Sequence, residues 1–225
     1  MSLNAQKQAC VVGAGYAGLF LVLKLLECGF KVNHLFEESE TTASQVSHGT
    51  VITKQQTDYR DIQFELKVKG KRYLNKYLKR IGLPLEHLIT GCCELYETEQ
   101  QFLEIADRAF SNSSTNAENL KETALDSLIF RKGTEALLYH DDFWIDSEKL
   151  IEFLFVKARE YGSMYVPIQD KVCTLDYGSQ QQNIILRTPL KRYTADNLFL
   201  APGNNTPKVL NELGYCIPHK VQKGA

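Results

Sequence analysis

The sequence predicts an α/β protein built around a mostly parallel sheet. Three observations support this class: a short apolar run at residues 9–12 ends at a glycine, helix-forming residues 16–28 follow, and a second apolar run occupies residues 31–37. A strand, a glycine turn, a helix and another strand in this order form a βαβ unit, and such units build parallel sheets. Later segments predict an inserted antiparallel ribbon and part of a second layer.

The composition is that of an ordinary folded protein. The 225 residues include 26 Lys and Arg and 27 Asp and Glu, giving a formal charge of −1, and 44% are hydrophobic. Disordered chains combine low hydrophobicity with high net charge, so this chain is predicted to be ordered. The small net charge argues against a surface built for nucleic acid or anionic membranes. The length allows one large domain or two small ones.

The apolar stretch at residues 9–30 is not typical of a membrane anchor or a signal peptide. It is interrupted by glycines and carries Lys24 and Glu27, whereas a spanning helix needs about 20 mostly apolar residues with few charges. Six scattered cysteines without a CxxC pair favour a reduced chain, with Cys92 and Cys93 as an alternative redox pair. We therefore expect a cytoplasmic protein without a transmembrane segment or a metal site.

Three later segments are predicted to be helical. Between residues 62 and 81 apolar side chains recur every three to four positions, and Gly82 ends the pattern. A similar stripe runs through residues 148–161 and stops before Gly162. Residues 99–110 are also expected to be helical.

The strands that follow the last of these helices are short. Apolar runs occupy residues 164–167, 172–177, 184–188 and 197–203, and the polar residues 178–183 join the middle two as a hairpin. Upstream, the polar triplet 140–142, His-Asp-Asp, could form an acid–base cluster, but we expect a turn there. The antiparallel ribbon is therefore predicted to be a late insertion into the parallel sheet.

The motif with the clearest chemical content is Gly13-Ala14-Gly15-Tyr16-Ala17-Gly18. In a GxGxxG turn between a strand and a helix, the first glycine permits the tight turn and the second lets the backbone approach a pyrophosphate. The third glycine lets helix and strand pack closely. The helix N-terminus adds unpaired N–H groups and partial positive charge. We therefore expect residues 13–18 to bind a dinucleotide.

Two acidic residues follow the second predicted strand. A carboxylate at Glu37 or Glu38 can accept hydrogen bonds from ribose hydroxyls, and it would repel a 2′-phosphate. Glu37 is the favoured residue, and the alternative is that both are solvated residues at a strand end. Because NAD and FAD both bind to this type of turn, the glycine motif alone does not separate the two cofactors.

Further motifs resemble those of the FAD-dependent oxidoreductases of the D-amino-acid oxidase superfamily. Residues 43–52, Ala-Ser-Gln-Val-Ser-His-Gly-Thr-Val-Ile, resemble the loop that runs past the ribityl chain and flavin. Asp170-Lys171-Val172 resembles the strand end whose valine contacts adenine through its backbone, and residues 195–203 resemble the second FAD motif. The order of elements is most similar to the branch that contains the L-2-hydroxyglutarate dehydrogenases.

The resemblance implies a Rossmann-like FAD-binding domain formed by residues 1–90 and 147–225, with a partial substrate segment at residues 91–146. It implies a flavoprotein that oxidises a small amine or 2-hydroxy acid by hydride transfer from a C–H bond to FAD. The residues expected to bind FAD are Gly13, Ala14, Gly15, Tyr16, Ala17, Gly18, Glu37, Glu38, Ser44, Gln45, Val46, Ser47, His48, Val172, Ala201, Pro202 and Gly203.

The expected catalytic groups are less well defined. No residue is assigned as a catalytic base. His48 could lie near the flavin as a proton carrier or an attachment point, and the alternative is an ordinary loop histidine. Pro202 departs from the family pattern, because small residues stand there in relatives and proline lacks an N–H donor.

The end of the sequence is the largest departure from the family pattern. The sequence stops at Ala225, before the later substrate-domain strands and the last FAD motif of complete relatives. We therefore expect a missing C-terminal half or a partner subunit. The alternatives are a catalytically inactive dinucleotide-binding remnant, a partner module or, with less support, an NAD-binding module.

Overall fold

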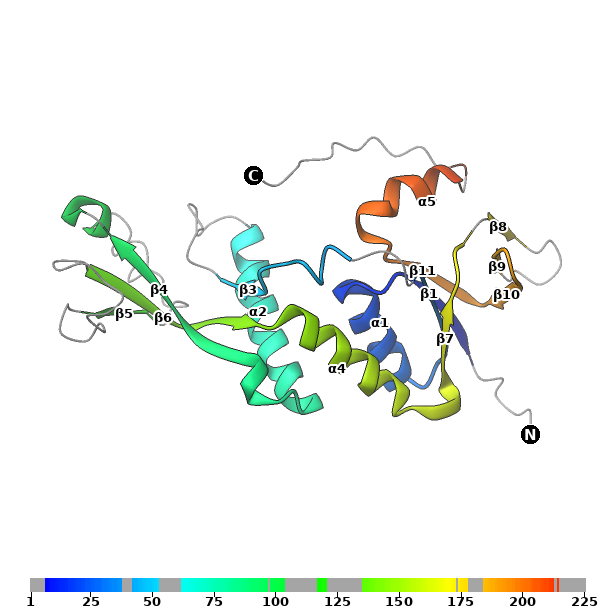
Figure 1. The fold of residues 1–225 in the computed structure, drawn as a ribbon, viewed down its shortest axis with the longest axis horizontal. Coiled ribbons are helices and arrows are strands. Elements are labelled where there is room, and N and C mark those ends of the chain that lie inside the picture. Colours follow the sequence, from blue (N-terminus) through cyan, green and yellow to red (C-terminus); the bar gives the residue numbers. More distant parts are fainter. Residues whose placement is uncertain are drawn as a thin grey trace. The chain divides into compact units, whose positions relative to one another are not determined.

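The computed structural model describes residues 7–37, 42–52, 62–96, 98–103, 117–120, 135–172, 174–177, 184–212 and 214. The chain divides into two compact units (Figure 1). The first unit comprises residues 1–47 and 147–225, and the second comprises residues 48–146. The finer division into two FAD-binding segments and a substrate segment stays a prediction.

The first unit is built on a four-stranded sheet with the order β11–β1–β2–β7. Its strands are β1 (Gln8–Val12), β2 (Lys31–Phe36), β7 (Tyr165–Gln169) and β11 (Asn197–Leu200). Every neighbouring pair is parallel, which confirms the predicted βαβ start and parallel sheet. Because parallel strands end at the same edge, the segments that follow them meet there.

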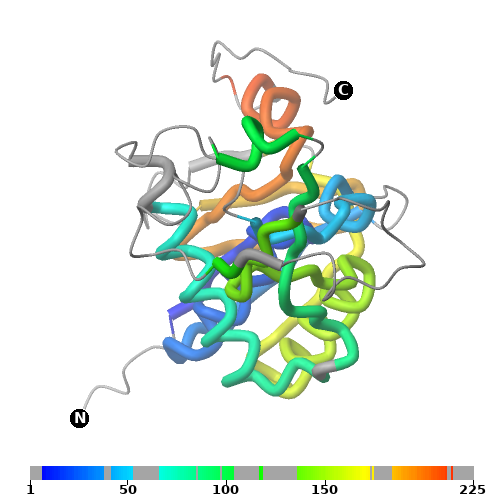
Figure 2. Tube along the Cα trace, turned by 90° about the vertical axis from the view of Figure 1, so that its left-hand side faces the viewer, coloured from blue at the N-terminus to red at the C-terminus, as the bar shows by residue number. Residues whose placement is uncertain are grey.

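Two helices of the first unit, α1 (Tyr16–Glu27) and α4 (Ser147–Arg159), pack against each other. Their paths can be followed in two views (Figures 1 and 2). Leu19 and Val22 of α1 and Leu150 and Leu154 of α4 are buried. Burying such side chains contributes about 1.5–3 kcal/mol each, which stabilises the helices far more than their intrinsic propensity does.

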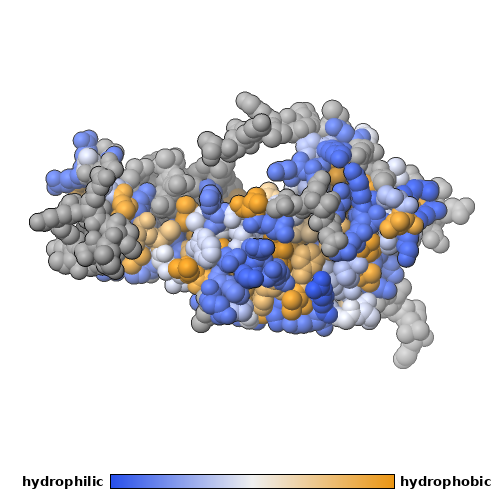
Figure 3. All heavy atoms as spheres, viewed as in Figure 1, coloured by the Kyte–Doolittle hydropathy of each residue, from blue (hydrophilic) through white to orange (hydrophobic). Residues whose placement is uncertain are grey.

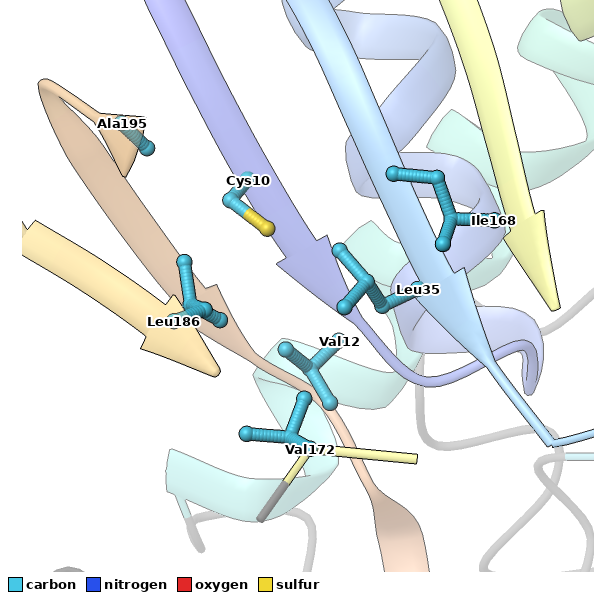
Figure 4. Packing of buried hydrophobic residues seen from close by; sticks show 7 residues of the cluster. All are labelled: Cys10, Val12, Leu35, Ile168, Val172, Leu186 and Ala195. Carbon is cyan, nitrogen blue, oxygen red and sulfur yellow. The ribbon is translucent and has the colours of Figure 1, made fainter. Parts of the chain in front are cut away.

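The late ribbon forms a separate antiparallel sheet with the order β10–β9–β8. Its strands are β8 (Thr174–Tyr177), β9 (Ile184–Arg187) and β10 (Arg192–Ala195). The predicted hairpin is confirmed by the pairing of β8 with β9. Figure 4 shows how this ribbon meets the parallel sheet: Leu186 and Ala195 share one buried cluster with Cys10, Val12, Leu35, Ile168 and Val172. The ribbon therefore covers part of the parallel sheet.

Beyond β11, a 3-10 turn η4 (Gly203–Asn205) leads into a short helix α5 (Thr206–Glu212).

Among the described residues, none of the helices combines the length and apolar character that crossing a bilayer requires. Hydrophilic and hydrophobic residues are interspersed over the face drawn in Figure 3.

The second unit combines a long helix with an antiparallel sheet. Its helix α2 (Ile62–Ile81) has the bounds that the periodicity predicted, and the turn η1 (Leu85–His87) follows it. The strands are β3 (Thr50–Val51), β4 (Leu88–Tyr96), β5 (Ala117–Leu120) and β6 (Glu135–Ile145). The order is β3–β6–β4, and β5 also pairs with β6. Residues 99–103 are helical, and the rest of the predicted 99–110 helix lies outside the described residues.

The turn predicted at residues 140–142 is wrong, because all three residues belong to β6. Asp142 is fully buried and its Oδ1 lies 2.6 Å from Lys71 Nζ of α2. His140 Nε2 lies 3.0 Å from Glu118 Oε2 on β5. The run of polar residues is typical of a turn, but partners on neighbouring elements satisfy two of the three side chains within the strand.

The two adjacent cysteines also lie in this sheet. Cys92 is opposite Tyr139 and Cys93 is opposite Leu138 in the ladder of β4 and β6. Successive residues of a strand point to opposite faces. The geometry therefore does not favour the redox pair that the sequence left open.

Candidate functional site

A pocket of about 480 Å³ lies in the first unit at the carboxyl ends of the parallel strands. Its lining comes from the turn after β1, from the ends of β2, β7 and β11, from residues 42–44 and from the start of α5. The predicted site residues that line it are Gly13, Ala14, Gly15, Glu37, Ser44, Val172, Ala201, Pro202 and Gly203. Residues from distant parts of the sequence therefore meet at one edge of the sheet.

The turn after β1 tolerates no side chain at its first glycine. Gly13 has a φ of +112°, and a Cβ there would collide with the carbonyl oxygen of Ala201. Its N–H donates to Leu35 O at 2.8 Å, and the Ala201 N–H donates to Val12 O at 2.8 Å. These hydrogen bonds hold the turn between the ends of β2 and β11. The backbone of Gly13, which carries no side chain, lies beside the pocket.

The other two glycines of the motif serve close packing. A Cβ on Gly18 would overlap the carbonyl oxygen of Gly13, so the first turn of α1 lies directly against the end of β1. A Cβ on Gly15 would lie 3.1 Å from Ser44 Oγ. The tight turn predicted at Gly13 and the close packing predicted at Gly18 are therefore visible as steric limits in the folded chain, and the approach of a pyrophosphate at Gly15 stays a prediction.

The N-terminus of α1 faces this backbone without a compensating acid. The helix begins at Tyr16, has no side-chain cap and has no acidic residue in its first turn. The Tyr16 N–H donates to Ser44 Oγ at 3.1 Å. The partial positive charge of the helix N-terminus is therefore left for an anion beside the glycine turn, which suits a pyrophosphate.

A buried histidine is hydrogen-bonded to the glycine turn, and the sequence did not predict this contact. His34 of β2 has no exposed surface. Its Nε2 lies 2.9 Å from Gly13 O, and because a carbonyl only accepts, Nε2 carries the proton. Its Nδ1 then accepts from the Tyr165 hydroxyl at 3.0 Å. The only signal in the sequence is one polar residue within an apolar strand.

Burial sets the protonation of this pair of side chains. It lowers the pKa of His34 to about 4, while the hydrogen bond to Gly13 acts in the opposite direction. Burial also raises the pKa of Tyr165 to about 12, against the effect of Arg159. At neutral pH the chain from Tyr165 through His34 to Gly13 is therefore uncharged and fully hydrogen-bonded.

Two carboxylates follow neighbouring strands at the edge of the pocket. Glu37 follows β2 and is exposed, and Asp170 follows β7. The Asp170 N–H donates to Phe36 O at 3.1 Å, which holds the two strand ends together. Glu38 lies outside the described residues. Glu37, one of the two candidate ribose acceptors, lines the pocket.

The remaining predicted residues lie outside the lining of the pocket. Tyr16, Ala17 and Gly18 form the first turn of α1, and the buried Tyr16 hydroxyl has no hydrogen-bond partner among the residues that the structure describes. Gln45, Val46 and Ser47 continue the loop from Ser44; Val46 is 70% exposed, and Ser47 Oγ lies 2.8 Å from Ser147 Oγ. His48 is exposed and belongs to the second unit.

Three polar residues that line the pocket were not predicted as site residues. Asn204, Asn205 and Lys208 follow the second motif and add polar groups beside Gly203. Within the part of the chain that the structure describes, no group of three or more His, Cys, Asp or Glu residues could hold a metal ion. The bare glycine backbone and the uncapped helix start fit the pyrophosphate of a dinucleotide, and an exposed carboxylate at the next strand end fits its ribose.

The comparisons with known proteins agree with this geometry. The model of the family described as FAD dependent oxidoreductase matches residues 8–224. None of the curated proteins matches the sequence significantly. Similar solved structures include the L-amino acid deaminase from Proteus myxofaciens in complex with anthranilate, with 20% identity and a TM-score of 0.76, covering 97% of this chain and 50% of that one.

Two other solved structures have a similar fold. The glycine oxidase from Geobacillus kaustophilus has 14% identity and a TM-score of 0.74, covering 93% of this chain and 59% of that one. The L-alpha-glycerophosphate oxidase from Mycoplasma pneumoniae, solved with FAD bound, has 17% identity and a TM-score of 0.70, covering 93% and 57%. The chain thus spans 50–59% of the length of these three structures.

Proposed function

Since the chain belongs to the FAD dependent oxidoreductase family, we propose that its first unit binds the adenosine-diphosphate half of FAD in the pocket at the edge of the parallel sheet. The family and its cofactor, FAD, agree with the predictions from the sequence. The observation that carries the proposal is the turn at Gly13, whose bare backbone lines the pocket beside the N-terminus of α1, a helix with no side-chain cap and no acidic residue in its first turn.

Each lining residue has a distinct part in this proposal. The backbone at Gly13 and Gly15, with the N-terminus of α1, binds the pyrophosphate. Glu37 accepts hydrogen bonds from the ribose, and Val172 contacts the adenine. Ser44 orients the start of α1 through its bond to Tyr16. The remaining predicted residues of the loop, 45–48, are proposed to run toward the flavin.

FAD supplies the redox chemistry by accepting a hydride from a substrate C–H bond. The residues of this chain bind and orient the cofactor, and His34 keeps the glycine turn in place without adding charge. We assign no catalytic base. The substrate is proposed to be a small amine or a 2-hydroxy acid, and the branch of L-2-hydroxyglutarate dehydrogenases stays a prediction beside the amino acid oxidases.

The proposal is tested by titrating the full chain with FAD and with NADH, and measuring fluorescence and the visible flavin spectrum. We expect saturable binding of FAD and none of NADH. Gly13→Ala should abolish FAD binding, because its Cβ would collide with Ala201. Gly29→Ala is the matched control, since Gly29 also has a positive φ, +82°, but open space around it. Absence of FAD binding in the unmodified chain would refute the proposal.

A second function is supported by a different observation. Because the chain spans 50–59% of the length of the three matched structures, we keep the proposal of a dinucleotide-binding module that acts with a partner polypeptide. Stoichiometric FAD binding without reduction by amino acids or 2-hydroxy acids would favour the module. Reduction of the bound flavin by one of these substrates would favour the oxidoreductase.

A further inference from the structure

Two serines join the two sequence segments that make up the first unit. The chain leaves this unit at Ser47 and returns to it at Ser147. The two hydroxyl oxygens lie 2.8 Å apart, and the Ser147 hydroxyl donates to Ser47 O at 3.0 Å. Because the chain passes into the second unit after Ser47, this contact fixes the end of the first segment within its own unit.

The hydrogen bonds continue from Ser47 to the wall of the pocket. Ser47 Oγ donates to Ser44 O at 3.0 Å. Each hydroxyl has one proton and each carbonyl oxygen only accepts, so the two protons can satisfy both carbonyls at once. Ser44 lines the pocket, and its Oγ accepts the Tyr16 N–H at the start of α1. The contacts therefore run from Ser147 to the N-terminus of α1.

The loop that contains Ser44 is closed by its own hydrogen bonds. The Thr42 N–H donates to Gln45 Oε1 at 2.7 Å, and the Gln45 N–H donates to Thr42 Oγ1 at 3.2 Å. The Val46 N–H donates to Thr42 O at 3.4 Å. A displacement at Ser47 is therefore passed on to Ser44, because the turn between them is braced.

The position of Ser147 suits an anchor for this loop. It is the first residue of α4 and only 6% exposed, and a hydrogen bond in a buried environment is stronger than one in water. The buried side chains of Leu150 and Leu154 hold α4, which packs against α1. The loop is therefore bonded to the first turns of two helices that pack against each other.

We propose that Ser147 is a positioning residue of the nucleotide site, acting through Ser47 and Ser44 on the start of α1. This inference rests on the proposed binding of FAD. Ser44 lies close to the glycine turn, since a Cβ on Gly15 would be 3.1 Å from Ser44 Oγ. Without the Ser147 hydroxyl the loop is less ordered before binding, and the nucleotide has to restore that order at a cost in affinity.

The test measures the Kd of the full chain for ADP by calorimetry and for FAD by flavin fluorescence. Ser147→Ala should weaken both about three- to tenfold, as expected for one neutral hydrogen bond. Ser147→Thr keeps a hydroxyl and should bind both as the unmodified chain does. The control is Ser163→Ala, at an exposed serine in the turn η3 (Gly162–Met164) that follows α4, and it should change neither Kd.

A double-variant cycle separates positioning from a general effect on the fold. If Ser147 acts through Ser44, Ser44→Ala combined with Ser147→Ala should weaken ADP no more than Ser44→Ala alone, whereas independent effects would multiply. Ser47→Ala gives a second variant in case Ser147→Ala does not fold, because Ser47 is exposed. It removes the donor to Ser44 O and should weaken ADP to a similar extent. Circular dichroism melts report which variants are folded.

The outcomes distinguish this inference from the proposed function. Unchanged binding of ADP and FAD in Ser147→Ala or in Ser47→Ala overturns the role of Ser147 while FAD binding stands. Independent effects in the double variant, or a loss in Ser147→Thr equal to that in Ser147→Ala, also overturn it and assign the loss to the packing of α4. If the unmodified chain binds neither nucleotide, the proposed function and this inference fail together.

Discussion

The two units bury polar side chains in opposite ways. In the first unit, His34 is fully buried as a neutral ring whose two nitrogens both have partners, Gly13 O and the Tyr165 hydroxyl. In the second unit, Lys71 and Asp142 form an ion pair of 2.6 Å with exposed fractions of 8% and 0%. The first arrangement connects β2 to the glycine turn beside the pocket, and the second connects α2 to β6.

This difference teaches where each unit is sensitive. Burying a neutral group that is hydrogen-bonded costs little free energy. It makes the stability of the unit sensitive to pH, since protonation would place a charge in an apolar environment. A buried ion pair is sensitive to the loss of either partner, because the remaining charge is then unpaired. Substitutions in the second unit should therefore act on stability, and those near the pocket should act on pH dependence and binding.

The largest effect is expected from breaking the ion pair. Asp142→Ala removes the carboxylate that lies 2.6 Å from the buried Lys71 ammonium and should lower the free energy of unfolding by about 3–5 kcal/mol. Trp144, the only tryptophan in the sequence, lies in β6 two residues away. Its fluorescence during urea unfolding therefore reports on the second unit.

The paired replacement of both residues sharpens this test. Lys71→Met combined with Asp142→Leu removes both charges and keeps apolar volume, so it should be neutral or stabilising. If the single and double variants lose equal stability, the ion pair is not the cause and the loss is one of packing.

A smaller effect concerns the pH dependence of the first unit. The pKa of His34 in the folded chain is about 4, below the ordinary value of 6.5. Between these values the unfolded chain binds a proton that the folded chain does not, so stability is full above pH 6.5 and falls as the pH falls toward 4. The loss is about 3 kcal/mol over this window.

Circular dichroism melts at several pH values measure this slope. His34→Gln should reduce it, because the titrating ring is absent, whereas His48→Gln should leave it unchanged because His48 is exposed. An unaltered slope in His34→Gln would assign the acid sensitivity to other groups.

The same comparison explains what the sequence could predict. Local patterns gave the bounds of α2, the βαβ start and the glycine turn, because periodicity and turn chemistry depend on neighbouring residues. The partners of buried polar groups depend on distant residues: His34 meets Tyr165, 131 positions later, and Asp142 meets Lys71, 71 positions earlier. Such pairs leave no local pattern, and for that reason the polar residues 140–142 predict a turn although they form part of a strand.

In the candidate site, too, the residues that belong to a local motif could be predicted, and those that depend on distant parts of the chain could not. The glycines and Glu37 belong to a motif with fixed spacing, so their convergence could be expected. The places of Asp170 and of the polar residues after Gly203 in the lining of the pocket could not be expected, since they follow from the folded packing of the strand ends.

The smallest expected change in stability comes from Glu37, which is exposed at the pocket. Glu37→Ala should leave the melting temperature within the scatter of surface substitutions and weaken FAD binding about tenfold, because a hydrogen bond to a charged acceptor is lost. Glu152→Ala, on the exposed side of α4, is the control and should change neither quantity. A changed melting temperature with unchanged FAD affinity would contradict the comparison, since the exposed carboxylate would then act on the fold. Unchanged affinity and stability together would move the ribose contact to Glu38 or remove it.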